Sequence, residues 1–272
     1  MIAIIDADSI LYRACHNVKT LDQATVKYLD IAKEYITTTW ADKAVCYVKG
    51  EGNWRYDVFK YYKAQRSHNK ALFLRQYGMN VDMIPVLIDW LVEHKFVIRA
   101  NGMEADDLVR RRAVKCVDRG QNFTIISADK DLDCIAGKHI RPYKSTLNEY
   151  TITQEEADYN YYKQIMIGDE VDYIKSPRLL GPKTADKLLN STPRGQWKSM
   201  IEREYKERCG KEWLHALMFT GSLIHIQRYK DDFFVWDKNK GNFWECGFKE
   251  APACYGYKID ELEAKARQNE MS

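Results

Sequence analysis

The sequence predicts an α/β fold built on a mostly parallel central sheet flanked by helices. Short apolar runs alternate with amphipathic helical patterns through the first two-thirds of the chain, an arrangement typical of parallel sheets. The chain has 272 residues, of which 45% are hydrophobic, enough for one core domain with a smaller appendage. In such sheets, ligands bind at the carboxyl ends of the strands.

The elements of the first part of the chain follow from their periodicity. The predicted strands are the apolar runs at residues 2–5, 44–48, 96–99 and 123–127. The predicted helices, each with an apolar face, are residues 21–39, 83–94 and 104–118. Residues 1–150 are therefore the predicted α/β core.

From residue 151 onward the pattern becomes mostly helical. Thr153 and Glu156 form a capping box for a helix that ends near Gly168, and Pro182 suits the first turn of another helix. The remaining predicted elements are helices at residues 196–208 and 213–229 and a hairpin at 233–248, turning at 239–241. Residues 151–272 are the predicted helical part.

Ten carboxylates gather in four tight groups, and two of the groups directly follow predicted strands. The groups are Asp6 with Asp8, Glu104 with Asp106 and Asp107, Asp129 with Asp131 and Asp133, and Asp169 with Asp172. Like charges at the ends of buried strands repel one another and lose hydration. Hard divalent cations with oxygen ligands relieve that cost, so the pattern predicts an Mg²⁺ or Mn²⁺ site.

Each group has a plainer explanation when it is taken alone. Acids favour helix N-termini, where Glu104 and Asp107 would share one face. Turns rich in Asp are common, although Asp129 and Asp131 would point the same way in an extended segment. Asp133 is equally suited to capping. The four groups together are less easily explained as ordinary solvent-exposed acids.

Composition excludes several classes of protein. The seven cysteines are scattered and form no CxxC pair, which argues against a zinc site or a disulfide framework and favours a reducing cytoplasm. No stretch approaches membrane-spanning length. An acid, Asp6, follows only a short apolar run at the N-terminus, so no signal peptide is expected.

Basic and aromatic residues are interleaved between positions 55 and 75, although the net charge of the chain is only +3. That window holds six basic residues, one acid and five aromatics. Such a segment suits a phosphate backbone beside stackable bases. A solvated amphipathic segment is the alternative explanation. The basic residues are Arg55, Lys60, Lys63, Arg66, Lys70 and Arg75.

Five motifs, in their order and spacing, resemble the 5′-nuclease (flap endonuclease) superfamily. They are IIDADS, MEADDLV, ISADKDLD, IGDEVDYI and LLGPKTA, and they cover residues 1–189. The chain resembles the small phage enzymes and is similar to the N-terminal nuclease domain of bacterial DNA polymerase I. The resemblance implies a PIN/5′-nuclease-like core, a helical arch at about 60–80 and a helix–three-turn–helix at about 160–190.

The resemblance also implies phosphodiester hydrolysis with two Mg²⁺ ions, for which Mn²⁺ substitutes. The implied ligands of the first ion are Asp6, Glu104 and Asp106. The implied ligands around the second ion are Asp107, Asp129, Asp131, Asp169 and Asp172. The motif YYKAQR would place Lys63 and Arg66 on the scissile phosphate as further catalytic residues.

The same resemblance implies how nucleic acid is held. Tyr62 would stack on the terminal base, and the helix–three-turn–helix would grip duplex DNA, often with a bound K⁺ ion. The implied nucleic-acid-binding residues are Arg55, Tyr62, Lys63, Arg66, Lys70, Lys183 and Thr184.

The chain departs from the family pattern in two loops. Gly181 is the sole glycine where the family usually has several, and Ser176 and Leu179 stand where glycine is common. Side chains there hinder close approach of the backbone to phosphate. Gly50 stands near the position where the family supplies another metal-ligating acid, and Glu51 is the nearest acid.

The resulting expectation is a monomeric, Mg²⁺-dependent 5′-3′ exonuclease or flap endonuclease. It would act on DNA with a free 5′ end, nick or flap, or on an RNA–DNA hybrid. A setting among phage replication proteins in a host cytoplasm is implied. The alternatives are a haloacid-dehalogenase-type phosphatase, which the Asp-x-Asp of IIDADS resembles, and a non-catalytic DNA-binding protein.

Overall fold

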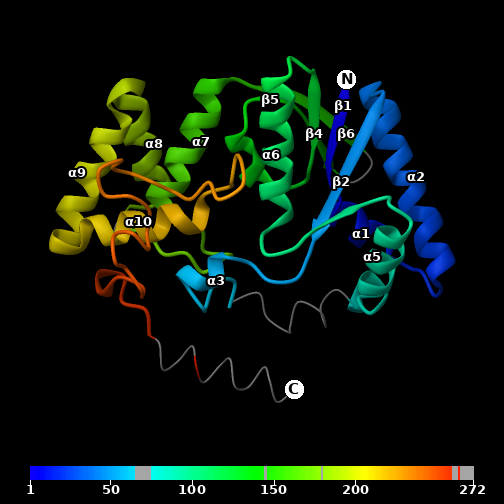
Figure 1. Ribbon diagram of the computed structural model, residues 1–272, viewed down its shortest axis with the longest axis horizontal. Helices are drawn as coiled ribbons and strands as arrows, with labels where there is room; N and C mark the ends of the chain where they lie inside the picture. Colours follow the sequence, from blue (N-terminus) through cyan, green and yellow to red (C-terminus); the bar gives the residue numbers. More distant parts are fainter. Residues whose placement is uncertain (65–74, 144–145, 179, 259–262, 264–272) are drawn as a thin grey trace. The chain divides into compact units, whose positions relative to one another are not determined.

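Figure 1 presents a computed structural model that describes residues 1–64, 75–143, 146–178, 180–258 and 263. The chain divides into two compact units. The first comprises residues 1–53, 69–157 and 226–230, and the second comprises 54–68, 158–225 and 231–272. Compared with the predicted division after residue 150, residues 54–68, 151–157 and 226–230 lie in the opposite unit.

The first unit is built on a six-stranded sheet in the order β3-β2-β1-β4-β5-β6. The strands are β1 (Ile2–Asp6), β2 (Lys43–Lys49), β3 (Ile98–Ala100), β4 (Phe123–Ile126), β5 (Gly137–Tyr143) and β6 (Thr146–Ile152). The first five strands run parallel, and β6 pairs antiparallel with β5. The predicted mostly parallel sheet is therefore confirmed.

Helices flank the sheet. They are α1 (Asp8–Ala14), α2 (Leu21–Thr39), α5 (Met83–Glu93) and α6 (Ala105–Asp118). On β1, Ala3 and Ile5 belong to an apolar cluster with α1, α2 and α5. Because side chains alternate along a strand, Ile2 and Ile4 point the other way, and α6 packs on β1, β2, β3 and β4. The parallel strands therefore end at one edge with helices around them.

The second unit is helical and has an aromatic core. Its helices are α3 (Arg55–Val58), most of α7 (Gln154–Ile167), α8 (Pro182–Ser191), α9 (Trp197–Cys209) and α10 (Trp213–Ile224). The capping box before α7 is confirmed, since the backbone N–H of Thr153 donates to Glu156 Oε2 over 2.8 Å. Phe59, Trp197 and Phe219 lie in the core. Across the described part of the chain, every helix is too short or too polar to cross a bilayer.

Two predictions for this unit were wrong. The helix predicted to reach residue 229 ends at Ile224, because His225 adopts an extended backbone and bonds Asp232 over 3.1 Å. The predicted hairpin at 233–248 contains no strand, since residues 242–247 turn instead. The Asn242 side chain accepts from the N–H groups of Trp244 and Glu245, and this local capping competes with strand pairing.

Candidate active site

Asp6 ends β1 and is the buried member of the first acid group. Only 7% of its surface is exposed. Its Oδ2 accepts from the Ser127 hydroxyl over 2.8 Å, and its Oδ1 accepts from the N–H of Asp8 over 3.2 Å. Burial, with the charges of Asp8 and Asp129, raises the pKa of Asp6 to about 7 against these hydrogen bonds. Binding of a proton or of a cation to this carboxylate is therefore favoured.

The third acid group is joined to the first through Ser127 at the end of β4. The Ser127 hydroxyl accepts from the N–H of Asp129 over 2.9 Å, while it donates to Asp6. Asp129 then caps the 3₁₀ segment η1 (Lys130–Cys134) by accepting from the N–H of Asp131. This cap tightens the chain into a turn, which is the plainer of the two conformations that the sequence allowed for Asp129 and Asp131. Ser127 carried no signal in the sequence beyond its place before the acids.

Asp133 has a different environment from its neighbours. Both of its oxygens accept from Arg141 over 2.7 Å, and the Tyr150 hydroxyl donates to it over 2.9 Å. This bidentate ion pair joins η1 to the β5–β6 hairpin. Asp133 therefore supports the loop of the third acid group.

The second acid group forms the N-terminus of α6. Glu104 is the N-cap and Asp107 completes a capping box, so acids in this first turn stabilise the helix. Glu104 Oε1 also accepts from the Asn53 amide over 3.0 Å. Asn53 follows β2, so this contact ties together two loops at the carboxyl edge of the sheet.

Asp107 is fully buried, and backbone N–H groups reach both of its oxygens. Oδ2 accepts from Glu104 over 3.1 Å, and Oδ1 accepts from Gln227 over 2.8 Å. The side chain of Gln227 in turn accepts from Arg111. Asp107, which the sequence placed among the metal ligands, therefore fixes the start of α6, whereas Asp106 is half-buried.

The loop after β2 has no room for the acid that the family pattern leads one to expect. A Cβ on Gly50 would lie 2.2 Å from the backbone oxygen of Ala100 and 2.4 Å from Asn101 Oδ1. Any side chain there requires the backbone to shift. Glu51 is exposed, and its N–H donates to Asn101 Oδ1 over 3.2 Å.

The donor set suits a hard cation by its chemistry and charge. All of the candidate ligands are carboxylates, those of the first three acid groups follow the edge of the sheet where the parallel strands end, and neighbouring acids oppose the charge on Asp6. Within the described ranges, no three His, Cys, Asp or Glu side chains are grouped closely enough for one metal ion. The type of donor and the repulsion between the acids are therefore the two features that suit these residues to a hard cation.

The second unit brings the YYK motif to the fourth acid group. Lys63 donates its backbone N–H to Asp172 O over 2.9 Å, and its Nζ lies 3.5 Å from Asp172 Oδ2. The Tyr62 hydroxyl donates to the same carboxylate oxygen over 3.0 Å. Asp169 Oδ1 accepts from the N–H groups of Val171 and Asp172. Residues far apart in the sequence thus form one cluster.

The other predicted nucleic-acid residues have different outcomes. Arg55 is only 1% exposed, and it donates from Nε to Leu223 O over 3.0 Å while its guanidinium lies over Trp54. The buried guanidinium is used inside the protein, and nucleic-acid binding by Arg55 stays a prediction. Arg66, Lys70 and Leu179 lie outside the described residues. Lys183 is exposed and Thr184 half-buried in the first turn of α8.

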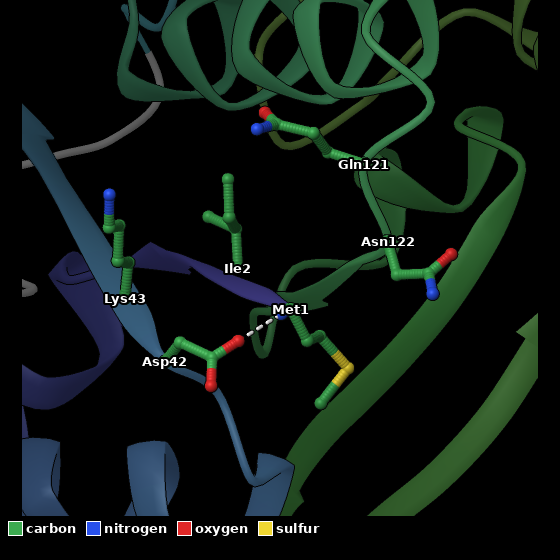
Figure 2. A pocket seen from close by; sticks show the side chains of 6 residues that line it. All are labelled: Met1, Ile2, Asp42, Lys43, Gln121 and Asn122. Atoms are coloured by element: carbon green, nitrogen blue, oxygen red, sulfur yellow. Dashed lines mark hydrogen bonds and ion pairs between the residues drawn. The ribbon is translucent and has the colours of Figure 1, made fainter.

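A pocket of about 240 Å³ lies away from these acids. Figure 2 shows its lining residues, which are Met1, Ile2, Asp42, Lys43, Gln121 and Asn122. They lie at the amino ends of β1, β2 and β4, opposite the edge that carries the acid groups. The Met1 amino group pairs with the Asp42 carboxylate there. This pocket is therefore distinct from the candidate site.

Comparison with known families decides the assignment. Residues 1–163, more than half of the chain, match the family described as 5′-3′ exonuclease, N-terminal resolvase-like domain. The chain belongs to this 5′-3′ exonuclease family. The 5′-nuclease resemblance of its acid motifs is thereby confirmed.

Relatives of this family member differ widely in length. DNA polymerase I of Rhizobium leguminosarum is 24% identical over 74% of this chain and 21% of its own length. A 5′-3′ exonuclease of Buchnera aphidicola subsp. Schizaphis graminum is 23% identical over 86% of this chain and 83% of its own. The chain thus spans about a fifth of the polymerase relative and most of the exonuclease.

Solved structures share the fold. A bacteriophage T5 flap endonuclease, crystallised with DNA and metal ions, has a TM-score of 0.60 to this chain at 14% identity. The match covers 81% of this chain and 88% of that one. At this identity, the likeness establishes a common fold.

Proposed function

We propose that this chain is a metal-dependent 5′-3′ exonuclease and flap endonuclease that hydrolyses DNA phosphodiesters. One observation carries the proposal. Carboxylates from three loops meet the carboxyl edge of the sheet, and the buried Asp6 among them has a raised pKa that a bound cation would lower again. Membership of the 5′-3′ exonuclease family supports the same reaction.

The residues proposed to hold two Mg²⁺ ions, or Mn²⁺ in their place, are seven of the predicted ligands. They are Asp6, Glu104, Asp106, Asp129 and Asp131 in the first unit and Asp169 and Asp172 in the second. Bound ions would supply an activated water and stabilise the leaving 3′-oxygen. We assign Asp107 to support of α6, because both of its oxygens already accept backbone hydrogen bonds.

Cationic residues of the second unit are proposed to act on DNA. Lys63 holds its ammonium beside Asp172, and with Arg66 it would offset charge that develops on the scissile phosphate. Tyr62 would stack on a terminal base. Lys183 and Thr184 open α8, where N–H groups and the helix dipole favour a phosphate, and Lys70 would add a further contact.

The proposed substrate is DNA with a free 5′ end, a nick or a flap, with RNA–DNA hybrids included. Recognition would rest on backbone contacts and duplex shape, because the candidate binding groups are cations and N–H groups that suit phosphate. A role beside replication proteins, a cytoplasmic location and a K⁺ ion near α8 complete the proposal. The names of the polymerase and exonuclease relatives support this setting.

The phosphatase alternative fits the site less well. A phosphatase of that type would use the first carboxylate of IIDADS, Asp6, as a nucleophile towards phosphorus. Both oxygens of Asp6 accept hydrogen bonds from Ser127 and Asp8, and the group is buried. A buried carboxylate whose oxygens are both hydrogen-bonded is poorly placed to attack phosphorus.

The test is cleavage of a 5′-labelled flap duplex in EDTA and then in Mg²⁺ or Mn²⁺. We expect a short 5′-labelled fragment that forms only with the cation, and its length separates cutting at the junction from stepwise removal of nucleotides. Hydrolysis of a simple phosphomonoester without cleavage of DNA would overturn the proposal in favour of a phosphatase. Cation-independent binding without any hydrolysis would favour a non-catalytic DNA-binding protein.

A further inference from the structure

Asp172 lies between two residues with a strained backbone. Lys63 and Tyr173 both have a φ of 61°, in the left-handed region that residues other than glycine rarely occupy. The N–H of Lys63 donates to Asp172 O, and Tyr173 follows Asp172 directly. Such conformations persist only where the surroundings impose them, and they are common at functional sites. Contacts around Asp172 must therefore hold these two residues in place.

The base of the loop is fixed by its own backbone. Asp169 and Ile174 exchange both of their N–H···O bonds, at 2.9 and 2.6 Å. Gly168, with a φ of 68°, precedes the bridge, and a Cβ there would lie 2.3 Å from Ile174 O. This closure sets the ends of the loop, and inside it the N–H of Tyr173 donates to Glu170 O over 3.2 Å.

The carbonyl of Tyr173 is held by a segment more than eighty residues later in the chain. The Tyr257 hydroxyl donates to Tyr173 O over 3.1 Å and accepts from the N–H of Lys175 over 2.9 Å. The two tyrosine rings lie 5.4 Å apart, and the Tyr257 ring also lies 4.8 Å from Phe59. The Tyr257 phenol thus bridges the backbone groups on either side of Ile174. Burial raises the pKa of Tyr257, so the phenol keeps its proton at neutral pH.

Lys175 makes the second connection between the loop and this segment. Its Nζ donates to Tyr255 O over 3.1 Å and to Gly256 O over 2.9 Å. The same ammonium lies 4.6 Å from the centre of the Tyr257 ring. The cation is therefore turned towards backbone carbonyls of the protein, in contrast to the exposed Lys183 of α8.

The segment is itself anchored to the core of the second unit. The Tyr255 hydroxyl lies 3.1 Å from Ala216 O and 2.6 Å from Thr220 Oγ1, both on α10. Glu212 accepts from the N–H groups of Ala253 and Cys254. These bonds anchor residues 253–255 to α10 and to the residue that precedes it.

From these contacts we propose that residues 252–258 form a clamp that holds Asp172 in place for cation binding, with Tyr257 as its positioning residue. The inference rests on the proposed function, because it assigns Asp169 and Asp172 to a cation. It gives the C-terminal part of the chain a role in the active site. Tyr257 acts through the backbone of Tyr173 and contacts neither substrate nor cation.

Tyr257→Phe is the direct test, because it keeps the ring and removes both hydrogen bonds of the hydroxyl. Residues that orient metal ligands typically contribute about tenfold or more to metal affinity. We expect calorimetric or EPR titration with Mn²⁺ to show about tenfold weaker binding of one ion. The rate of flap cleavage should fall at low Mn²⁺ and recover at high Mn²⁺, with DNA binding in Ca²⁺ unchanged.

Two further variants complete the test. Lys175→Met removes the ammonium bonds and should show the same Mn²⁺ dependence, which covers the case that Tyr257→Phe fails to fold. Tyr229→Phe, an exposed tyrosine of the first unit, is the matched control and should behave as wild type. Wild-type Mn²⁺ affinity in folded Tyr257→Phe or Lys175→Met would overturn the clamp, even if thermal stability fell. If wild type cleaves nothing, the proposed function fails, while the Mn²⁺ titration still tests the clamp.

Discussion

Burial and the neighbouring acids both disfavour the ionised form of the Asp6 carboxylate. Its pKa is raised from 3.8 to about 7, so the folded chain keeps this proton to a higher pH than the unfolded chain does. Without a metal, stability should therefore fall as pH rises from about 4 to about 7, and the penalty should be complete above that range. At about 1.4 kcal/mol per pH unit, the penalty amounts to roughly 4 kcal/mol at most.

We accordingly predict that Asp6→Asn is more stable than wild type in EDTA at pH 8, by about 1–4 kcal/mol, and no more stable at pH 4. Differential scanning calorimetry at the two pH values measures this difference. Asp30→Asn on the exposed side of α2 is the control for the charge change. A stability loss in Asp6→Asn at pH 8 would contradict the account of the buried carboxylate.

The backbone around Gly50 leaves no space for an acidic side chain after β2. We predict that Gly50→Asp costs about 2–4 kcal/mol of unfolding free energy, because its Cβ would overlap the backbone of Ala100. Gly195→Asp is the control, since nothing lies within 4 Å of a Cβ there. Urea denaturation of both variants compares them, and equal stability would show that the loop accommodates an acid.

Lys63 tests whether the cation beside Asp172 acts on the reaction or only attracts DNA. We predict that Lys63→Ala lowers kcat by about 100-fold or more while DNA binding in Ca²⁺ weakens only a few-fold, and that Arg66→Ala behaves similarly. Single-turnover kinetics and fluorescence anisotropy measure the two effects. An equal loss in both would assign these residues to steering of the DNA.

At the scale of elements, two adjacent residues at the start of α6 have different proposed roles. Asp107 supports the helix, and Asp106 binds a cation. We predict that Asp107→Asn destabilises the metal-free protein by about 1–3 kcal/mol, because a buried acceptor of two backbone hydrogen bonds changes. Asp106→Asn should cost less stability and should weaken Mn²⁺ binding more. Thermal unfolding in EDTA and Mn²⁺ titration separate the two roles. Weakened Mn²⁺ binding in Asp107→Asn with unchanged stability would restore Asp107 to the ligands.

The sequence predicted those elements whose apolar pattern is strong. The helix at residues 21–39 and the strands at residues 2–5 and 123–127 have clear apolar patterns, and the acids at the strand ends follow from the parallel sheet. The β5–β6 hairpin was missed because an edge strand pair carries charged residues, as in the ion pair of Lys138 with Glu149. Its pattern is therefore too polar to recognise.

The supporting contacts of the site could not be predicted from local sequence. Ser127 reaches Asp6 across 121 positions, Asn53 reaches Glu104 across 51, and Gln227 reaches Asp107 across 120. Each partner is a polar residue with no distinguishing neighbour in the chain. Only the folded sheet and the packing of α6 bring these groups together.

At the scale of the whole molecule, the proposed ligands and cations belong to two compact units. The first unit contributes acids at the edge of the sheet, and the second contributes Lys63 and the loop of Asp169 and Asp172. Because cation binding to the folded state alone stabilises it, Mg²⁺ should raise the melting temperature of a chain that carries all of these acids. The central claim is that the acids serve phosphodiester hydrolysis and are not needed to hold DNA.

The measurement that tests this claim most directly compares cleavage and binding in the double variant Asp129→Asn with Asp131→Asn. We predict no detectable Mg²⁺-dependent cleavage of a 5′-labelled flap duplex, because the ligand charge of the third acid group is lost. DNA binding in Ca²⁺ should stay within a few-fold of wild type. Asp30→Asn with Glu34→Gln, on the exposed side of α2, removes the same charge and should cleave normally. Cleavage at the wild-type rate by the Asp129, Asp131 double variant would contradict the metal-dependent mechanism.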